Sequence, residues 1–258
     1  MQAHIVLAHP EPKSFNAHLT QVARHTLEAQ GWNVSVSDLY GMGFDPCERP
    51  AHYDSRQNPL RFDVQAEQRH ASNQGTVPDF VTAEIAQLDR ADLIIFQYPM
   101  WWHLPPAILK GWLDRVLVFG EVYASTKRFE KGRFAGKRAM LSVTVGTSEE
   151  TYAHDGRSGD IDLLLWPVNF SLAYVGCTVL SPFIAYGVEG GLRYSETTVL
   201  ETRLKTVAEN YSAALANLKD RLVIPFNQMA EWGANGRIKK EAAVHSPFVR
   251  HRQHLALE

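Results

Sequence analysis

Residues 92–98 read DLIIFQY, and this short run, more than any other in the chain, determines the architecture. It is strongly apolar and contains β-branched residues, so we predict a strand buried on both faces at the centre of a sheet. Apolar residues with helical spacing precede it over residues 78–89, and a second helix is predicted over residues 105–117. A buried strand between two helices is typical of an α/β fold with a parallel sheet.

Outward from this centre, strands and helices alternate in both directions. Further strands are predicted over residues 5–8, 32–39, 138–145 and 178–185, and further helices over residues 16–29, 161–174 and 195–221. Because parallel strands need long crossover connections, the alternation predicts a doubly wound five-stranded parallel sheet with helices on both faces. No buried element is expected in the polar stretch 41–77.

The alternation stops near residue 221, which suggests two parts of unequal size. We expect a domain over residues 1–221 and a C-terminal extension over residues 222–258. The extension has little apolar periodicity and contains Pro225 and Pro247. We expect it to wrap a surface of the chain or a second subunit.

The composition of the 258 residues, with 45% hydrophobic and 21% charged, is typical of folded globular proteins and argues against disorder and coiled coils. Basic and acidic residues number 26 and 28, so no positive field attracts nucleic acid. The start of the chain lacks the features of a signal peptide, and no apolar run is long enough to span a membrane. We therefore expect a cytoplasmic protein without a membrane span.

Two cysteines, Cys47 and Cys177, form no CxxC pair. We therefore expect no disulfide framework and no sulfur-ligated metal site, with both thiols reduced and buried. No other arrangement of side chains predicts a bound metal.

Ligands of open α/β sheets bind at the carboxyl edge of the strands, where three loops are expected here. Residues 9–16 lead into a helix whose free N–H groups and positive dipole end favour phosphate oxygens. The alternative is an ordinary helix start, with Ser14 or Asn16 as the N-cap. Residues 99–103 bring two tryptophans and a histidine to the same edge, where a flat ring can stack, although packing in the core is the alternative.

The third loop, residues 144–148, contains small residues that let backbone N–H groups approach a ligand. Neither GxGxxG nor GxxxxGK[ST] occurs, which excludes the dinucleotide fingerprint and the P-loop. The absence of GxSxG likewise leaves a hydrolase unsupported. A phosphate loop, an aromatic loop and an amide loop at one edge together predict a flavin site.

Four runs resemble the NAD(P)H:quinone oxidoreductases of the DT-diaphorase type. They are AHPEPKSFN (8–16), FDVQAEQ (62–68), QYPMWWHLPPAILKGWLDRV (97–116) and GDIDLLLWPV (159–168). The resemblance implies a flavodoxin-like domain that binds FAD rather than FMN and forms a homodimer. It further implies a ping-pong hydride relay in which NADH or NADPH reduces a quinone or a similar flat acceptor by two electrons.

The resemblance also assigns roles to individual residues. Phosphates and the ribityl chain would be held by His9, Ser14, Phe15, Asn16 and Ala17. The flavin ring would lie along Pro99, Met100, Trp101, Trp102 and His103, and its polar edge would bond Thr144, Val145, Gly146 and Thr147. Tyr152 would be the catalytic tyrosine near the flavin carbonyl, and Tyr123 would line the quinone pocket across the dimer. Asp63 takes a position where relatives often contact the cofactor through glutamine.

Some positions depart from the family pattern. Ser158 replaces the histidine expected to act with Tyr152, and a hydroxyl cannot become a cation near neutral pH. His154 is a candidate substitute, with a solvated loop residue as the alternative. Thr147 replaces a glycine, and His103 replaces an aromatic residue, which makes the acceptor pocket more polar.

A protein of another class also fits the fold. An electron carrier of the flavodoxin type, or an ancillary regulatory subunit, binds flavin without turnover. Such carriers are shorter and usually strongly acidic, whereas this chain has a net charge of -2 and a long extension. The sequence therefore favours an NAD(P)H dehydrogenase (quinone).

Overall fold

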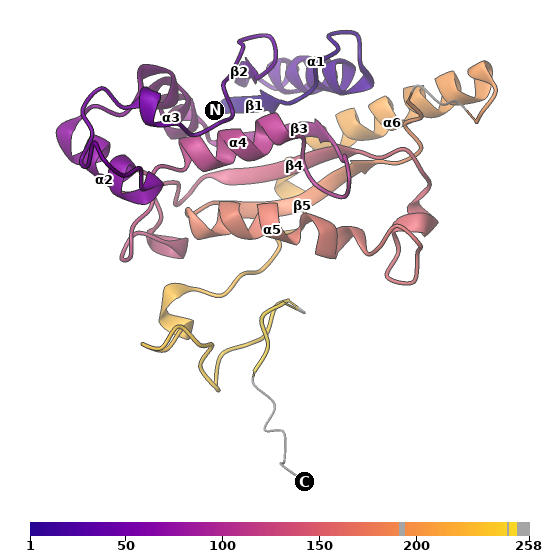
Figure 1. Ribbon diagram of the computed structural model, residues 1–258. Helices are drawn as coiled ribbons and strands as arrows, with labels where there is room; N and C mark the ends of the chain where they lie inside the picture. The colour runs from indigo at the N-terminus through magenta and orange to yellow at the C-terminus, as the bar shows by residue number, and fades with distance from the viewer. Residues whose placement is uncertain (191–193, 247, 252–258) are drawn as a thin grey trace.

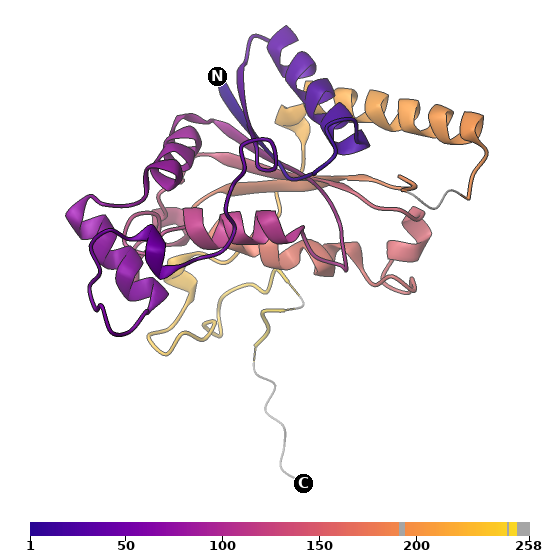
Figure 2. The same ribbon diagram turned by 45° about the horizontal axis from the view of Figure 1, so that its top comes forward.

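The computed structural model describes residues 1–190, 194–246 and 248–251. Within these residues, five strands form one parallel sheet with helices on both faces (Figures 1 and 2). The strands are β1 (Gln2–Leu7), β2 (Asn33–Asp38), β3 (Leu93–Pro99), β4 (Arg138–Thr144) and β5 (Thr178–Ala185). Their order is β2-β1-β3-β4-β5, which is the doubly wound order of flavodoxin-like proteins and confirms the predicted fold class.

The helices divide between the two faces of the sheet. Those in the described residues are α1 (Phe15–Ala29), α2 (Val64–Gln74), α3 (Asp79–Arg90), α4 (Ala107–Val116), α5 (Ile161–Tyr174) and α6 (Thr197–Ala216). The buried side chains of α1 and α6 form one core cluster with the sheet, and those of α3, α4 and α5 form the other. Figure 2 shows these layers on opposite sides of the sheet.

Strand β3 lies at the centre, as the apolar run predicts. All of its residues are buried, and it pairs with β1 on one side and β4 on the other. The Phe96 side chain meets the buried Trp112 ring of α4 edge-on, with ring centroids 5.6 Å apart. Burial on both faces explains why this strand is almost continuously apolar.

Helix α2 corrects the expectation that the polar stretch 41–77 holds no buried element. Asp63 caps its first turn by accepting a hydrogen bond from Ala66 N at 3.0 Å. Gly75 ends it in the left-handed conformation at φ 67°, which glycine adopts without strain. The helix buries Glu67, Gln68 and Ala71. It escaped prediction because two of these side chains are polar: Glu67, for example, is buried through hydrogen bonds from Arg56 and the Gln57 backbone.

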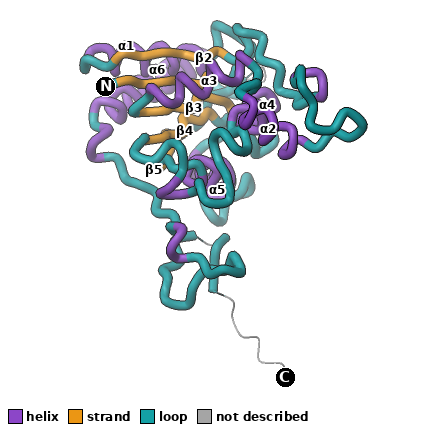
Figure 3. The backbone as a smooth tube through the Cα atoms, turned by 90° about the vertical axis from the view of Figure 1, so that its left-hand side faces the viewer, coloured by secondary structure: helices purple, strands orange, loops and turns teal. Residues whose placement is uncertain are grey.

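The C-terminal extension lies along its own chain in the part that the structure describes. Ser181 N donates to Leu222 O and Ile224 N donates to Val179 O, so the extension pairs antiparallel with the outer edge of β5. Beyond it, Phe226 packs on Phe170 of α5, and the described part of the extension continues below α5 (Figures 1 and 3). There Trp232 stacks on Phe129, and Phe248 packs on Trp166 of α5. Residues 247 and 252–258 of the extension lie outside the described residues.

The two cysteines differ in exposure, which corrects the expectation that both are buried. Cys177 is buried, whereas Cys47 is exposed on the connection after β2. Neither forms a disulfide. None of the helices in the described part of the chain combines the length and the apolar character that crossing a bilayer requires.

Candidate cofactor site at the carboxyl edge of the sheet

The three predicted loops meet at the carboxyl edge of the sheet. The His9 and Trp101 rings lie edge to face with centroids 6.0 Å apart, which joins the first loop to the second. Met100 N donates to Thr144 O at 3.0 Å, which joins the second to the third. Asn16 Nδ2 donates to Thr144 Oγ1 at 3.0 Å and joins the first to the third. The loops therefore form one continuous surface.

The first loop presents unpaired donors at the start of α1. Ser14 is the N-cap, and its hydroxyl accepts a hydrogen bond from Ala17 N at 3.1 Å. None of the hydrogen bonds among the described residues uses the backbone N–H of Phe15 or Asn16. Two free N–H groups at the positive end of α1, a helix of 15 residues, favour a negatively charged ligand.

His9 adds a directional donor to this loop. Its Nδ1 lies 3.0 Å from Glu11 N and 3.3 Å from Glu11 O, and the shorter contact, in which Glu11 N donates, favours the tautomer with the ring proton on Nε2. Burial lowers the pKa of His9, against the opposing effects of the Glu11 carbonyl and carboxylate. The ring is therefore neutral near pH 7 and offers one N–H group.

The second loop is a tight turn that exposes aromatic surface. Trp101 N donates to Leu104 O and Leu104 N donates to Trp101 O, at 2.9 and 3.0 Å. Between them, Trp102 and His103 have φ values of 52° and 62°, a left-handed conformation that bulky residues rarely adopt. Trp102 is 93% exposed and Trp101 41% exposed, so the alternative that they pack in the core is wrong. Strain of this kind is typical of functional sites.

The third loop keeps its backbone donors free. Its start is fixed by Val145 N, which donates to Ala185 O. In contrast, no hydrogen bond within the described part of the chain uses the N–H of Gly146, Thr147 or Ser148. A Cβ atom on Gly146 would meet only Val188 O, at 3.9 Å, so the space above this peptide is open. The loop is thus a shallow cradle of N–H groups.

A tyrosine pair borders this cradle. Tyr152 ends a short 3-10 helix (Glu149–Tyr152), and its ring lies 6.2 Å from that of Tyr186. Burial, followed by the charges of Glu149 and Asp162, raises the pKa of Tyr186 to about 12. The Tyr186 phenol therefore stays protonated at neutral pH. The Tyr152 hydroxyl has no hydrogen-bond partner among the described residues.

Tyr186 was missed by the sequence reasoning, although a signal for it exists. It directly follows β5, whose carboxyl end opens on the same edge as those of β1, β3 and β4. Gly187 N and Val188 N donate to Thr147 O and Val145 O, which holds this fourth loop against the third.

Ser158 lies close to Tyr152, the catalytic candidate, whereas His154 is exposed to solvent. Ser158 N donates to Thr151 O at 2.9 Å, next to Tyr152 in the chain. A Cβ atom on Gly156 would come within 2.4 Å of Thr151 O, so this loop folds back tightly on itself. His154 is exposed, as the alternative of a solvated loop residue predicts.

Two predicted site residues lie at the other end of the molecule. Tyr123 packs against Tyr174, with ring centroids 5.9 Å apart, and accepts a hydrogen bond from Gln65 of α2. Tyr174 is the last residue of α5, whereas Tyr152 precedes the start of that helix, about 21 Å away along its axis. Asp63 caps α2 near Tyr123. Figure 1 shows α2 and the connection from β4 to α5 at opposite ends.

The other predicted residues fall at the edge, although some support it rather than face a ligand. Pro99 and Val145 are buried, and the side chain of Asn16 donates a hydrogen bond to that of Thr144. Brought together at this edge are His9, Ser14, Phe15, Asn16, Ala17, Pro99, Met100, Trp101, Trp102, His103, Thr144, Val145, Gly146, Thr147, Tyr152 and Ser158. Tyr123 and Asp63 are the two that the chain does not bring there.

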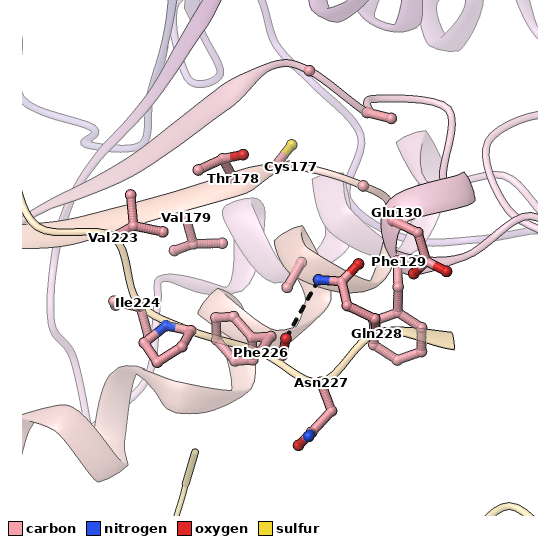
Figure 4. A pocket seen from close by; sticks show the side chains of 15 residues that line it. Phe129, Glu130, Cys177, Thr178, Val179, Val223, Ile224, Phe226, Asn227 and Gln228 are labelled. Atoms are coloured by element: carbon pink, nitrogen blue, oxygen red, sulfur yellow. Dashed lines mark hydrogen bonds between the residues drawn. The ribbon is translucent and has the colours of Figure 1, made fainter. Parts of the chain in front are cut away.

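A cavity elsewhere in the molecule lies away from this edge. A cavity of about 400 Å³ lies between the extension and the body, lined among others by Cys177, Val179 and Phe226 (Figure 4). It opens beside the start of β5, away from the carboxyl ends of the strands. No group of three or more metal-ligating side chains occurs in the described ranges.

A flavin fits the groups that the edge presents. The free N–H groups of Phe15 and Asn16 suit phosphate oxygens, and those of Gly146 and Thr147 suit the carbonyl and ring nitrogen atoms of an isoalloxazine edge. The exposed Trp101 and Trp102 offer flat surface on which the ring can lie.

Comparison with known proteins agrees with this site. The chain matches the family described as flavodoxin-like fold over residues 1–209. NAD(P)H dehydrogenase (quinone) 1 of Cavia porcellus is 41% identical over 190 residues, which cover 72% of this chain and 69% of that protein. The chain belongs to the quinone oxidoreductase family with a flavodoxin-like fold. Its close relatives are named as dehydrogenases, and the chain is accordingly an oxidoreductase.

Other members of this quinone oxidoreductase family support the assignment. Ribosyldihydronicotinamide dehydrogenase (quinone) of Homo sapiens is 41% identical over 189 residues, covering 72% of this chain and 81% of that protein. The crystal structure of a putative quinone reductase from Klebsiella pneumoniae superposes with a TM-score of 0.78 at 32% identity, over 90% of this chain and 91% of that one.

Proposed function

We propose that this protein uses FAD to reduce quinones, or similar flat electron-poor acceptors, by two electrons taken from NADH or NADPH. The observation that carries the proposal is the edge described above, where free N–H groups at α1 and after β4 flank exposed tryptophans. The names of the relatives support the reaction class.

A bound flavin supplies the chemistry, since it accepts a hydride from a nicotinamide and passes two electrons to an acceptor. The protein supplies binding and orientation. The neutral His9 offers its Nε2–H, and Phe15 and Asn16 offer their N–H groups, to the phosphates. The N–H groups of Gly146 and Thr147 hold the polar edge of the ring.

Tyr152 is the proposed catalytic residue. Its hydroxyl has no partner in the described part of the chain and lies beside the cradle of N–H groups, so a phenol O–H there can donate a hydrogen bond to an oxygen of the cofactor or acceptor. Ser158 offers a second hydroxyl nearby but cannot carry positive charge. Donor and acceptor would occupy the same exposed surface in turn, which gives ping-pong kinetics.

A homodimer would complete the site. A groove of about 540 Å³ runs between α4 and α5, with Leu104 next to the aromatic turn at one end and Tyr123 and Tyr174 at the other. A two-fold axis across the groove exchanges its ends, so each Tyr123 would come to the aromatic turn of the other copy. Asp63, near Tyr123, would follow it to the same site. The groove is largely apolar and Leu104 is 59% exposed, which favours burial by a second copy.

The cofactor and the donor are tested directly. We expect the purified protein to be yellow and heat-released chromophore to run as FAD in chromatography; release of FMN would correct the cofactor. Mixing the protein with NADPH or NADH and menadione should oxidise the nucleotide. Oxidation no faster than without protein would leave the alternative, a flavin-binding carrier or ancillary subunit. Because one relative is named for ribosyldihydronicotinamide, that donor belongs in the same assay.

The dimer has its own test. Sedimentation at micromolar concentration should give the mass of two chains. Monomer alone would contradict the two-fold arrangement and leave the positions of Tyr123 and Asp63 without a role in the site.

A further inference from the structure

A buried chain of side-chain amides lies beneath the proposed cofactor site. Gln97 Nε2 donates to Asn16 Oδ1 at 2.8 Å, and Asn16 Nδ2 donates to Thr144 Oγ1 at 3.0 Å. Gln97 is 0% exposed, Asn16 3% and Thr144 4%. These three hydrogen-bonded, buried side chains therefore link β3, the first turn of α1 and the end of β4.

We propose that Gln97 is a positioning residue for the cofactor. This inference rests on the proposed function and deepens it. Gln97 fixes the Asn16 side chain through this hydrogen bond. Asn16 in turn offers its backbone N–H at the start of α1. Thr144, at the far end, directly precedes the loop whose N–H groups face the ring. The amide chain thus sets the distance between the phosphate donors and the ring donors.

Two observations separate this role from ordinary core packing. The two side chains that precede Gln97 on the same face of β3, Leu93 and Ile95, are apolar and pack in the core with α1. Gln97 also keeps its Oε1 atom buried without a hydrogen-bond partner among the described residues. A half-satisfied amide is a poor choice for stability alone, since an apolar residue of equal size avoids this penalty.

The test compares single and double variants. Gln97→Leu removes the amide at similar volume, and Thr144→Val removes the hydroxyl while keeping a β-branched residue in β4. Titration of the flavin-free protein with FAD should show Kd raised about tenfold in each single variant. If both act through one hydrogen-bonded chain, the double variant should also be raised about tenfold, not the about 100-fold of independent effects.

Ser37→Ala is the matched control. The Ser37 hydroxyl is buried and donates to Glu84 Oε1 at 2.8 Å, on the opposite face of the sheet. Its loss should lower stability to a similar degree and change Kd less than about twofold. Amide hydrogen exchange in the flavin-free protein gives a second readout: Gln97→Leu should speed exchange at the hydrogen-bonded N–H groups of Ala17 and Val145, and Ser37→Ala at neither.

The outcomes are distinct. An unchanged Kd in folded Gln97→Leu, or effects that multiply in the double variant, would overturn the positioning role while leaving the proposed function intact. A wild-type protein that takes up neither FAD nor FMN would overturn both. If Gln97→Leu does not fold, Gln97→Met takes its place, because it also removes the amide at similar volume. Unchanged Kd and unchanged exchange at Ala17 and Val145 in that variant would overturn the positioning role.

Discussion

Replacing Gly146 with alanine separates the stability of the loop after β4 from its capacity to hold a cofactor. The added Cβ atom meets only Val188 O at 3.9 Å, and Gly146 is not among the glycines with positive φ, so the folded loop accepts it. Because alanine restricts the unfolded chain, we expect the free energy of unfolding to stay level or rise by about 0.4–1 kcal/mol.

Cofactor affinity should move in the opposite direction. The Cβ atom occupies open space next to the N–H groups of Gly146 and Thr147, which the proposed function assigns to the edge of the ring. Loss of about one hydrogen bond, worth roughly 1 kcal/mol, raises the Kd for flavin about fivefold.

Urea unfolding followed by circular dichroism measures the first quantity, and quenching of flavin fluorescence measures the second. Gly233→Ala in the C-terminal extension is the control, because its Cβ atom would lie 3.1 Å from the movable Asn235 side chain and far from the edge. The reasoning fails if Gly146→Ala binds flavin as tightly as wild type, or if it loses stability by more than about 1 kcal/mol.

Three further results are expected. Tyr152→Phe should lower the steady-state rate about tenfold without changing stability, because the hydroxyl has no partner in the described residues; an equal rate would make Tyr152 a packing residue. Burial and the charge of Arg90 lower the pKa of His4 to about 4, so the unfolded chain binds the extra proton and stability should fall by about 3 kcal/mol as pH drops from 6.5 to 4. His4→Gln should flatten this pH dependence in urea unfolding and the exposed His25→Gln should not. A thiol reagent should modify only Cys47 in the native protein and also Cys177 in urea, because burial raises the pKa of Cys177 to about 12; two reactive native thiols would contradict this.

The fold was predictable from sequence because its signals are local. The apolar run of β3 predicts a strand, and the helical spacing of apolar residues on either side of it predicts helices. The alternation of strands and helices along the chain then leaves only a few possible topologies for a parallel sheet. Helix α2 escaped because two of its three buried residues, Glu67 and Gln68, are polar. Their burial depends on hydrogen bonds outside the helix, from Arg56 to Glu67 and from Gln68 to the Asp114 backbone. Hydrophobic periodicity cannot detect a side chain that is buried through hydrogen bonds.

The candidate site was predictable in its loops but not in its connections. Position after a strand identifies residues 9–16, 99–103 and 144–148, and the same rule applied to β5 would have found Tyr186. In contrast, the link between Gln97 and Asn16 joins residues 81 positions apart, and no local pattern reveals it. The left-handed turn at Trp102 was also hidden, since tryptophan is not a residue that predicts positive φ.

The separation of Tyr123 from the loops by the length of α5 has a genetic consequence. In the proposed dimer each site draws its loops from one chain and its tyrosine from the other. Two inactive alleles, one damaged in a loop and one at Tyr123, would then pair into hybrids with one wholly intact site and one doubly damaged site. Co-expression would restore activity that neither allele has alone, whereas a site contained within a single chain would show no such complementation.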